Sequence, residues 1–241
     1  MLRKTVFMSL ILSFLSLTLT AEEAKEGGGM GYFMASWQSI SLSGLNKELN
    51  INGLPEFSES QYAFGGGGHG IIGNFIIGGE GHGLSGESKS NNLYKVSVSG
   101  GYGLFDVGYI VFKKDGLILY PLLGIGGGGL NVTIKEKATY DFNEVMKNPK
   151  RGIDLSNGGF ITAISLCADY LFSFGKDKDG SGGLMIGLRG GFLLPMYKGS
   201  NWSYNEQEIT NGPSADIKGF FFRLNIGGGG ISEKMTNKKG E

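Results

Sequence analysis

The sequence predicts an all-β fold, an eight-stranded antiparallel up-and-down transmembrane barrel. Three observations lead to this prediction. Large apolar residues alternate with small or polar residues at a period of two along most of the 241-residue chain. No segment carries a sustained apolar stripe at the 3.6-residue period of a helix. The links between the alternating segments are long and short in turn, as in a barrel whose two ends differ.

The clearest alternation runs from Gly159 to Tyr197, in two halves joined by a turn. One face of these halves is apolar and includes Phe160, Ile164, Leu166, Phe172, Leu184, Leu188 and Leu194. The other face is mostly Gly, Ala and Ser, with Asp169 and Arg189 as its charges. A sheet face in water usually carries Lys, Glu and Thr. The small face therefore fits a tight interior, which leaves the apolar face toward lipid.

The N-terminus has the features of a secretory signal peptide. Arg3 and Lys4 precede an apolar run of roughly 14 residues, shorter than the ~20 of a membrane-spanning helix. We expect a signal peptide at 1–21, cleaved after Ala21, with an uncleaved anchor as the alternative. No later window approaches 18 consecutive apolar residues. Entry of the mature chain into a membrane would therefore require a closed barrel.

Composition excludes several other classes of protein. Glycine supplies 45 residues without a three-residue period, and the 5 prolines are too few for collagen. Equal numbers of basic and acidic residues, 22 of each, do not indicate a nucleic-acid partner. Cys167 is the only cysteine, which excludes a fold held by disulfides within the chain. We expect no cofactor.

Eight strands account for most of the mature chain. A short leader at 22–28 precedes the expected barrel domain at 29–232, and a polar tail occupies 233–241. The expected strands are 29–43, 60–72, 75–85, 93–112, 117–134, 159–174, 182–198 and 218–231. Long links are expected at 44–59, 135–158 and 199–217, a medium link at 86–92, and short links at 73–74, 113–116 and 175–181. Odd-numbered links of an up-and-down barrel meet at one end, so that end carries the long loops.

One strand breaks its own alternation. In 93–112 the apolar phase set by Tyr94, Val96 and Leu104 changes at Asp106 to that of Val107 and Tyr109. A β-bulge near Asp106 would shift the phase by one residue. The alternative is a turn at this point, which would give nine strands.

Three tetraglycine runs occur at 65–68, 126–129 and 227–230. A phosphate-binding loop would need a following Lys-Ser/Thr and the start of a helix, and none of the runs has them. We interpret the glycines as relief of crowding in a small, sharply curved barrel, whose backbone neighbouring aromatic rings cover.

Asp169 and Arg189 lie about equally far from Asp179, the centre of their hairpin turn. They are therefore expected on the inward face, nearly opposite each other, as a structural ion pair. A role as a gate or constriction is the alternative.

His69, Glu80 and His82 form a second inward group, with His69 diagonal to Glu80 across the turn at Gly73. We expect them, with Asp169, Arg189, Arg223 and Asn225, to form a structural polar network in the lumen. Two alternatives exist. A His–Glu pair polarises the nucleophile in some lipid-A-trimming barrel enzymes, and two His with one Glu could bind zinc, although the spacing is unspecific. We expect neither catalytic residues nor a metal.

The signal peptide, eight strands, alternating links and polar inward faces together resemble the small eight-stranded bacterial outer-membrane barrels, the OmpA-like and OmpX-like class. The resemblance is architectural and covers most of the mature chain. It departs at the C-terminus, where Gly230-Ile231 is followed by a polar tail instead of ending the last strand on an aromatic residue. The resemblance implies an outer-membrane location, outer-membrane lipid as the surroundings, and no enzymatic activity.

Function would then lie in the long loops 44–59, 135–158 and 199–217, as contact surfaces for an extracellular or envelope partner. Three alternatives remain open at this point. The chain could be a soluble, lipocalin-like barrel with its apolar face inside, a narrow pore, or a lipid-modifying enzyme.

Overall fold

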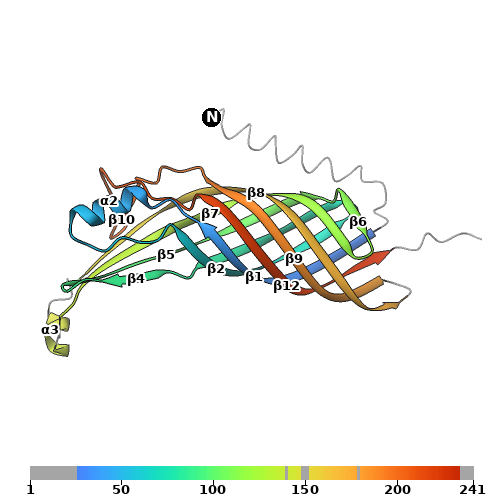
Figure 1. The fold of residues 1–241 in the computed structure, drawn as a ribbon, viewed down its shortest axis with the longest axis horizontal. Coiled ribbons are helices and arrows are strands. Elements are labelled where there is room, and N and C mark those ends of the chain that lie inside the picture. Colours follow the sequence, from blue (N-terminus) through green and yellow to red (C-terminus); the bar gives the residue numbers. More distant parts are fainter. Residues whose placement is uncertain (1–25, 139–140, 148–151, 178–179, 234–241) are drawn as a thin grey trace, which may run out of the picture.

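Eight long strands close into an antiparallel barrel in the computed structural model, which describes residues 26–138, 141–147, 152–177 and 180–233 (Figure 1). The strands are β1 (Glu26–Ser39), β2 (Ser60–Ile72), β3 (Phe75–Leu84), β5 (Tyr94–Tyr109), β7 (Leu117–Glu136), β8 (Gly152–Asp177), β9 (Gly180–Pro195) and β12 (Gly219–Glu233). Each pairs with the next, and β1 pairs with β12 from Glu26↔Glu233 to Gln38↔Phe221. The predicted eight-stranded barrel is confirmed. The expected signal peptide lies outside the described residues.

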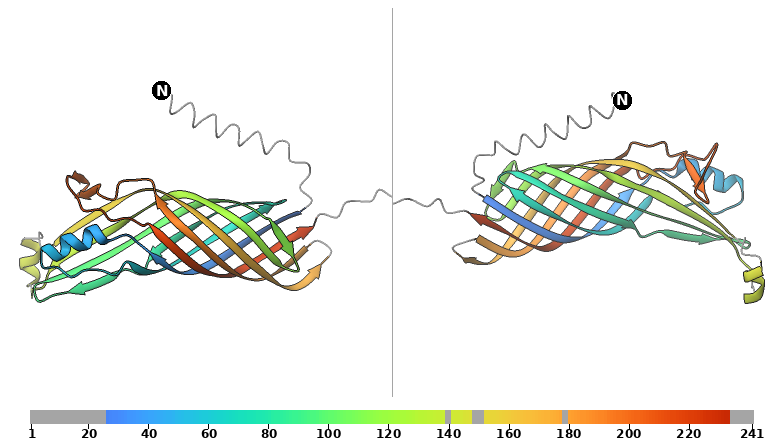
Figure 2. Two further views of the ribbon diagram at one scale, coloured as in Figure 1. Left: turned by 45° about the horizontal axis from the view of Figure 1, so that its top comes forward. Right: turned by 180° about the vertical axis from the view of Figure 1, so that it is seen from behind.

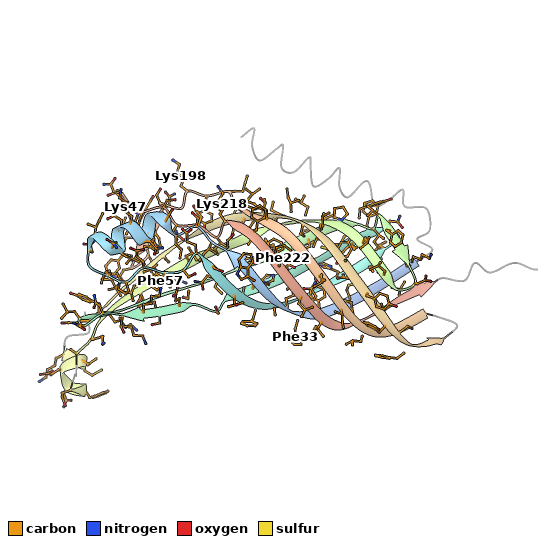
Figure 3. The ribbon with its side chains drawn as sticks, in the orientation of Figure 1. Phe33, Lys47, Phe57, Lys198, Lys218 and Phe222 are labelled. Carbon is orange, nitrogen blue, oxygen red and sulfur yellow. The ribbon has the colours of Figure 1, made fainter. Side chains whose placement is uncertain are left out.

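Apolar side chains cover the outer wall of the barrel. Phe33 on β1 is 81% exposed and Phe222 on β12 is 66% exposed, and both project from the wall (Figure 3). Asp169 and Arg189 point inward and are each 1% exposed. Such an apolar exterior is unfavourable in water and matches the lipid-facing band of a membrane barrel. The soluble alternative, with its apolar face inside, is wrong.

The two ends of the barrel differ as the link lengths predict. At the short-turn end, β2 and β3 meet at Gly73-Asn74, and β6 (Phe112–Lys114) forms a tight hairpin with β7. Its turn places Asp115 at φ 50° and Gly116 at φ 87°, the left-handed region that two-residue hairpin turns use. The third short link is at 178–179, outside the described residues.

None of the helices described is long and apolar enough to span a bilayer.

The long-loop end is folded. It contains α2 (Ser43–Ile51), β4 (Glu87–Ser90), α3 (Phe142–Lys147), β10 (Trp202–Tyr204) and β11 (Gln207–Ile209). β5, β7 and β8 run on beyond the barrel wall, with β4 paired to β5 and with β10 and β11 added beside β8 (Figure 2). The result is an open sheet outside the membrane. Its edge strands β4 and β11 are short and carry charges, which discourages pairing with other chains.

A cap, formed by 40–59 and by 196–218 with its strands β10 and β11, packs on the inner face of β5, β7 and β8. Its core consists of Leu42, Leu45, Leu49, Phe57, Trp202 and Ile217 against Val96, Val98, Leu130, Val132, Ile161 and Phe221 of the barrel strands. Lys47, Lys198 and Lys218 project from the cap at this end of the molecule (Figure 3). The cap therefore covers the outer mouth of the barrel with an apolar core like that of a soluble domain.

Two expectations about the long links are wrong. The strand expected at 29–43 ends at Ser39, and α2 follows it. The helix buries Leu45 and Leu49 against the cap, so tertiary burial stabilises it where its polar sequence does not. The link expected at 135–158 is shorter than predicted, because β7 reaches Glu136 and β8 begins at Gly152. The short helix α3 lies in the remainder.

β5 contains no bulge at Asp106. Its pairing with β7 runs from Tyr94↔Glu136 to Gly108↔Leu122 without a shift, and Asp106 is buried in the same phase as Leu104. What changes along β5 is its surroundings. The N-terminal half of β5, at the long-loop end, turns apolar residues toward the cap and serines toward water. The C-terminal half turns Asp106 into the lumen and Phe105 toward lipid. The bulge and the nine-strand alternative are both wrong.

Inward and outward glycines differ in the space around them. A Cβ at Gly67 would lie 2.7 Å from the carbonyl oxygen of Gly79, and one at Gly126 would overlap the backbone of Gly103. On the outer face, a Cβ at Gly127 would meet its nearest atom at 3.4 Å, and one at Gly81 would meet nothing within 4 Å. Crowding therefore explains the inward glycines of these runs, whereas on the outer face it applies only at some positions, such as Gly129, whose Cβ would overlap the Asn157 carbonyl oxygen.

Candidate functional site

The barrel interior is filled in three layers. Beneath the apolar core of the cap lies a polar layer around Glu80. At the short-turn end a second apolar cluster consists of Ile71, Ile76, Ile110, Ile118, Tyr120, Leu122 and Cys167. An eight-stranded barrel has an interior that side chains can fill, and the described residues do so here.

Glu80 is the centre of the polar layer. Its carboxylate accepts a hydrogen bond from Arg189 at 2.9 Å and forms a second ion pair with Arg223. His82 Nε2 lies 3.3 Å from the same carboxylate. These side chains are almost fully buried. One anion thus lies between two guanidinium groups from the opposite wall, and both buried cations depend on it as their ion-pair partner.

Aromatic side chains complete the surroundings of both arginines. The Arg189 guanidinium lies 4.6 Å from the centre of the Tyr32 ring and donates to the Tyr120 hydroxyl at 3.3 Å. Arg223 lies 3.8 Å from the centre of the Phe221 ring and donates to the Tyr102 hydroxyl at 3.1 Å. These contacts hold the guanidinium planes by cation–π attraction and by hydrogen bonds.

The predicted ion pair between Asp169 and Arg189 is wrong. The strand register places Arg189 opposite Cys167 and Asp169 opposite Gly187. Arg189 pairs with Glu80, on the far side of the lumen. Asp169 instead accepts a hydrogen bond from the Tyr120 hydroxyl at 2.5 Å, and that hydroxyl is the bridge between Asp169 and Arg189.

The two histidines belong to separate contacts. The register sets Gly67 opposite Glu80, so His69 lies diagonal to Glu80 as predicted. Its Nε2 lies 2.8 Å from the Tyr32 hydroxyl and 3.3 Å from Asp106. His82 stacks on the Tyr102 ring, with 4.8 Å between ring centres. Within the described residues, neither histidine hydrogen-bonds to a serine. There, too, no three His, Cys, Asp or Glu side chains gather where they could hold a metal ion.

Asn225 is fully buried in the same layer and pairs in register with Gly187, which lies beside Asp169. Its side-chain amide makes no hydrogen bond to the described residues. All seven residues that sequence reasoning assigned to the lumen therefore lie there: His69, Glu80, His82, Asp169, Arg189, Arg223 and Asn225.

Sequence reasoning missed four members of the network, namely Tyr32, Tyr102, Asp106 and Tyr120. The three tyrosines occupy inward positions of their strands, so the alternation of inward and outward residues could have identified them. Asp106 was missed because the apolar alternation of its strand changes at that residue.

Polar contacts join the two segments of the cap. Ser41 and Asp216 exchange backbone hydrogen bonds of 2.9 Å each, and Trp202 donates from its indole to the carbonyl of Pro213 at 2.6 Å. Partial burial raises the pKa of the Asp216 carboxyl above its ordinary value. The barrel strand β8 contributes Asn157, whose amide donates to the carbonyls of Gly199 and Ala215 at 3.0 and 2.8 Å.

The hairpin of β7 and β8 ends in an arm tip, α3, at the far end of the molecule from the short turns (Figure 1). Phe142 is 75% exposed and Met146 is 67% exposed, and Val145 lies beside them at helical spacing. An apolar helix face in water, remote from the lipid band, is the kind of surface that proteins use for contact.

No protein-family model matches the sequence, and no curated protein matches it. Among solved structures, the chain is similar to Ail, the attachment invasion locus protein of Yersinia pestis, with a TM-score of 0.44 and 9% identity over 85% of this chain and 98% of that one. It is similar to the outer membrane protein OprG of Pseudomonas aeruginosa, with a TM-score of 0.37 and 12% identity over 87% and 97%.

A third similar structure is Neisserial surface protein A, with a TM-score of 0.33 and 9% identity over 86% of this chain and 96% of that one. The architecture of the present chain is established by its own strand pairing and side-chain distribution. Its eight long strands close into a barrel, the outer wall of that barrel is apolar, and its interior is filled. The chain is an eight-stranded antiparallel transmembrane β-barrel with a folded cap at one end.

Proposed function

We propose that this protein is a bacterial outer-membrane barrel, without enzymatic or pore activity, that holds a folded contact surface outside the cell. A closed barrel with short turns at one end and long loops at the other has the form of outer-membrane barrels. The expected signal peptide at 1–21 would direct the chain there. In this orientation the cap and the arm tip face outward, and the short turns face the periplasm.

The filled lumen is the single observation that carries the anchoring role. The core of the cap, the layer around Glu80 and the cluster at the short-turn end lie one behind another along the lumen. An ion crossing the barrel would have to displace all three. Purified protein in planar bilayers is therefore expected to give no stepwise conductance. Regular single-channel steps would favour the narrow pore and contradict the proposal.

The ionic layer favours the pore as a second candidate, since a charged constriction can act as a gate. In that case weakening the layer should open the barrel. We expect Glu80→Gln to give no conductance in planar bilayers, because one apolar cluster remains on each side of the polar layer. Conductance of this variant above that of the wild type would support the gate.

A catalytic role has little support in the lumen. His69 is engaged by Tyr32 and Asp106, and His82 by Glu80. No serine within the described residues is hydrogen-bonded to either histidine as a nucleophile would be. Replacing His69 and His82 by alanine should leave the lipid A of the producing cells unchanged. A lipid A species that depends on either histidine would contradict the proposal.

The arm tip is the strongest candidate for contact with a partner. The outward apolar residues of β7 end at Ile125, and residues 126–136 continue the strand, a reach of roughly 36 Å at ~3.3 Å per residue. The exposed side chains of α3 are thus held well away from the membrane by a continuous hairpin. This loop falls within the long link 135–158; 44–59 and 199–217 form the cap beside it.

Site-specific crosslinking tests this role. A photoreactive residue at Met146 should give a discrete adduct on cells that carry the protein in their outer membrane. The same residue at Ile51, an exposed apolar position on α2, is the matched control. Adducts at Met146 alone support the arm tip. Equal labelling at both positions, or none at Met146, contradicts a specific contact there.

A further inference from the structure

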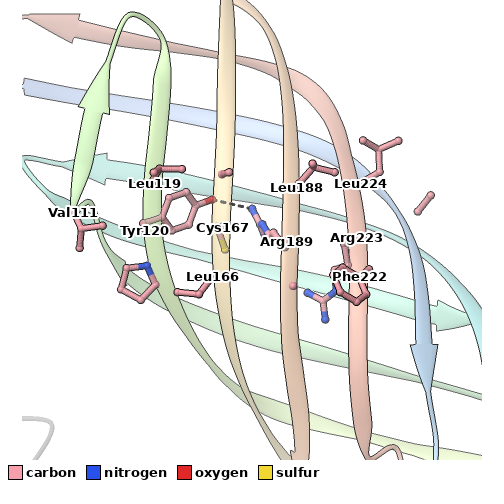
Figure 4. Close-up of a pocket in the computed structure, with 14 residues that line it drawn as sticks. Val111, Leu119, Tyr120, Leu166, Cys167, Leu188, Arg189, Phe222, Arg223 and Leu224 are labelled. Carbon is pink, nitrogen blue, oxygen red and sulfur yellow. Dashed lines mark hydrogen bonds between the residues drawn. The ribbon is translucent and has the colours of Figure 1, made fainter.

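The lipid-facing wall of the barrel contains a hollow of about 760 Å³ that crosses from β7 to β1 (Figure 4). Most of the side chains that line it are apolar and point outward. The hollow therefore opens on the membrane side of the wall. Four inward residues, Tyr120, Cys167, Arg189 and Arg223, lie between the outward ones along the strands and complete its lining.

Two neighbouring rows of outward residues form the hollow. The strand register sets Leu119, Ala168, Leu188, Leu224 and Ala35 side by side across five strands. The next row is Pro121, Leu166, Gly190 and Phe222. We call this hollow the furrow. Its floor lies where the rows carry Ala or Gly, and its walls lie where they carry leucine, proline or phenylalanine.

The furrow has the length of one hydrocarbon chain. Five adjacent strands at ~4.8 Å spacing span about 19 Å across the wall. One leaflet of the bilayer contributes about half of a ~30 Å hydrocarbon core. Because strands of such barrels are tilted by ~35–45°, a row across them runs obliquely, and the furrow follows the wall upward from the short-turn end.

The lower end of the furrow adjoins a basic side chain. Leu119 and Val111 lie at this end, and β6 follows directly after Val111. Lys114 of β6 pairs in register with Leu117, so it shares the outward face with Leu119, and it is exposed. A cation at this depth, on the periplasmic side, is placed to attract the phosphate of a lipid headgroup.

We propose that the furrow is a binding site for one phospholipid of the periplasm-facing leaflet. One of its two acyl chains lies along the two rows, and its phosphate lies against Lys114. The inference rests on the membrane orientation proposed above. An apolar chain in an apolar furrow gains contact without unpaired polar groups, and the lysine adds a preference for anionic headgroups.

Filling the furrow provides the test. A Cβ at Gly190 would meet the Phe222 ring at 3.4 Å, an ordinary contact, so larger side chains fit on the outer face. In the variant, Gly190→Leu is combined with Ala168→Leu. Gly103→Leu is the matched control: it places a leucine on the outer face, outside the furrow, where a Cβ has its nearest atom at 3.6 Å.

The proteins are reconstituted in nanodiscs of phosphatidylethanolamine and phosphatidylglycerol, released into mild detergent, and weighed by native mass spectrometry. We expect one retained phospholipid on the wild type and on Gly103→Leu. The filled variant should retain lipid about a hundredfold more weakly, the factor expected when about four methylene contacts are lost. Lys114→Gln should keep the lipid but lose the preference for phosphatidylglycerol.

Equal retention by the filled variant and the wild type would overturn the proposal, as would equal loss in Gly103→Leu. The proposal would also be overturned if the wild type had the mass of a dimer and the filled variant that of a monomer, because a second copy of the protein would then occupy the furrow. Electrophoresis without boiling reports barrel folding independently. A normal mobility shift with no retained lipid would thus refute the furrow site and leave the membrane barrel intact.

Discussion

Replacing Glu80 by glutamine should be among the most destabilising single changes in the barrel. The substitution keeps the size of the side chain and removes its charge. In the wild type the carboxylate is 2.9 Å from Arg189 and also pairs with Arg223, and the three side chains are at most 1% exposed. The substitution leaves two buried cations facing a neutral amide. Asp169 cannot replace the lost anion where it lies, because it hydrogen-bonds to Tyr120.

The magnitude follows from those contacts. Removing one partner of a buried ion pair costs ~3–5 kcal/mol, and here two arginines lose the same partner. We therefore expect the free energy of unfolding to fall by at least about 3 kcal/mol. With a urea dependence of ~2 kcal/mol per molar, the unfolding midpoint should move by about 1.5 M or more.

The assay is urea unfolding in lipid vesicles, with the folded fraction read from electrophoretic mobility without boiling. Glu87→Gln is the control, because Glu87 pairs with Lys89 at 2.9 Å at the surface, where ion pairs contribute ~0–1 kcal/mol. A triple variant, Glu80→Leu with both arginines changed to methionine, should recover most of the stability. A Glu80→Gln midpoint close to that of the control would refute the view that the layer depends on this carboxylate.

Four further predictions follow. Gly126→Ala should disrupt folding, since its Cβ would overlap the opposite backbone, whereas Gly127→Ala should be neutral or stabilise by up to about 1 kcal/mol; unfolding midpoints of the two variants separate these outcomes. Leu45→Ala should destabilise the cap by about 2–4 kcal/mol and make 40–59 sensitive to protease without altering the gel shift of the barrel. Burial raises the pKa of Asp216, so the folded cap binds this proton more tightly than the unfolded chain does. Cap stability should fall as pH rises from 3.8 through the folded pKa, and Asp216→Asn should remove that slope in protease-sensitivity profiles. N-terminal sequencing of protein from membranes should begin directly after Ala21.

The direction of the side chains of β8 and β9 could be predicted from the sequence because strand periodicity is local. Asp169 and Arg189 point inward, and Phe160 and Leu188 outward, as the alternation requires. A turn of known position fixes the register of a hairpin, and a one-residue slip would turn every side chain to the wrong face. The eight strands and the unequal ends follow from the same local information.

The partners within the lumen could not be predicted in the same way. Arg189 and Glu80 are 109 positions apart, and Arg223 and Glu80 are 143 apart. Barrel curvature brings them together across the lumen, and no pattern along one hairpin reports it. Sequence reasoning therefore paired Arg189 with Asp169, its neighbour within the hairpin. In the structure Asp169 and Arg189 are joined only through the hydroxyl of Tyr120, which donates to Asp169 and accepts from Arg189.

The helix α2 was missed for a related reason. Leu42, Leu45 and Leu49 have helical spacing, but the helix is only nine residues long and contains Gly44 and Asn46, so it would be marginal on its own. The helix is stabilised by the apolar surface that β5, β7 and β8 present to it. Likewise, the apolar phase of β5 changed at Asp106 because its inward face passes there from the apolar core of the cap to the polar layer of the lumen, a boundary that the strand itself does not mark.

The pairing of β1 with β12 determines when the protein can fold. Glu26 pairs with Glu233, so the contact that removes the two open strand edges joins residues near the two ends of the described chain. Contacts of such sequence separation are slow to form, and a barrel lacking its last strand presents unpaired backbone groups that lipid cannot satisfy. Closure must therefore wait until β12 is available to pair with β1. Any truncation within β12 would leave the chain unassembled, however well its other seven strands pair.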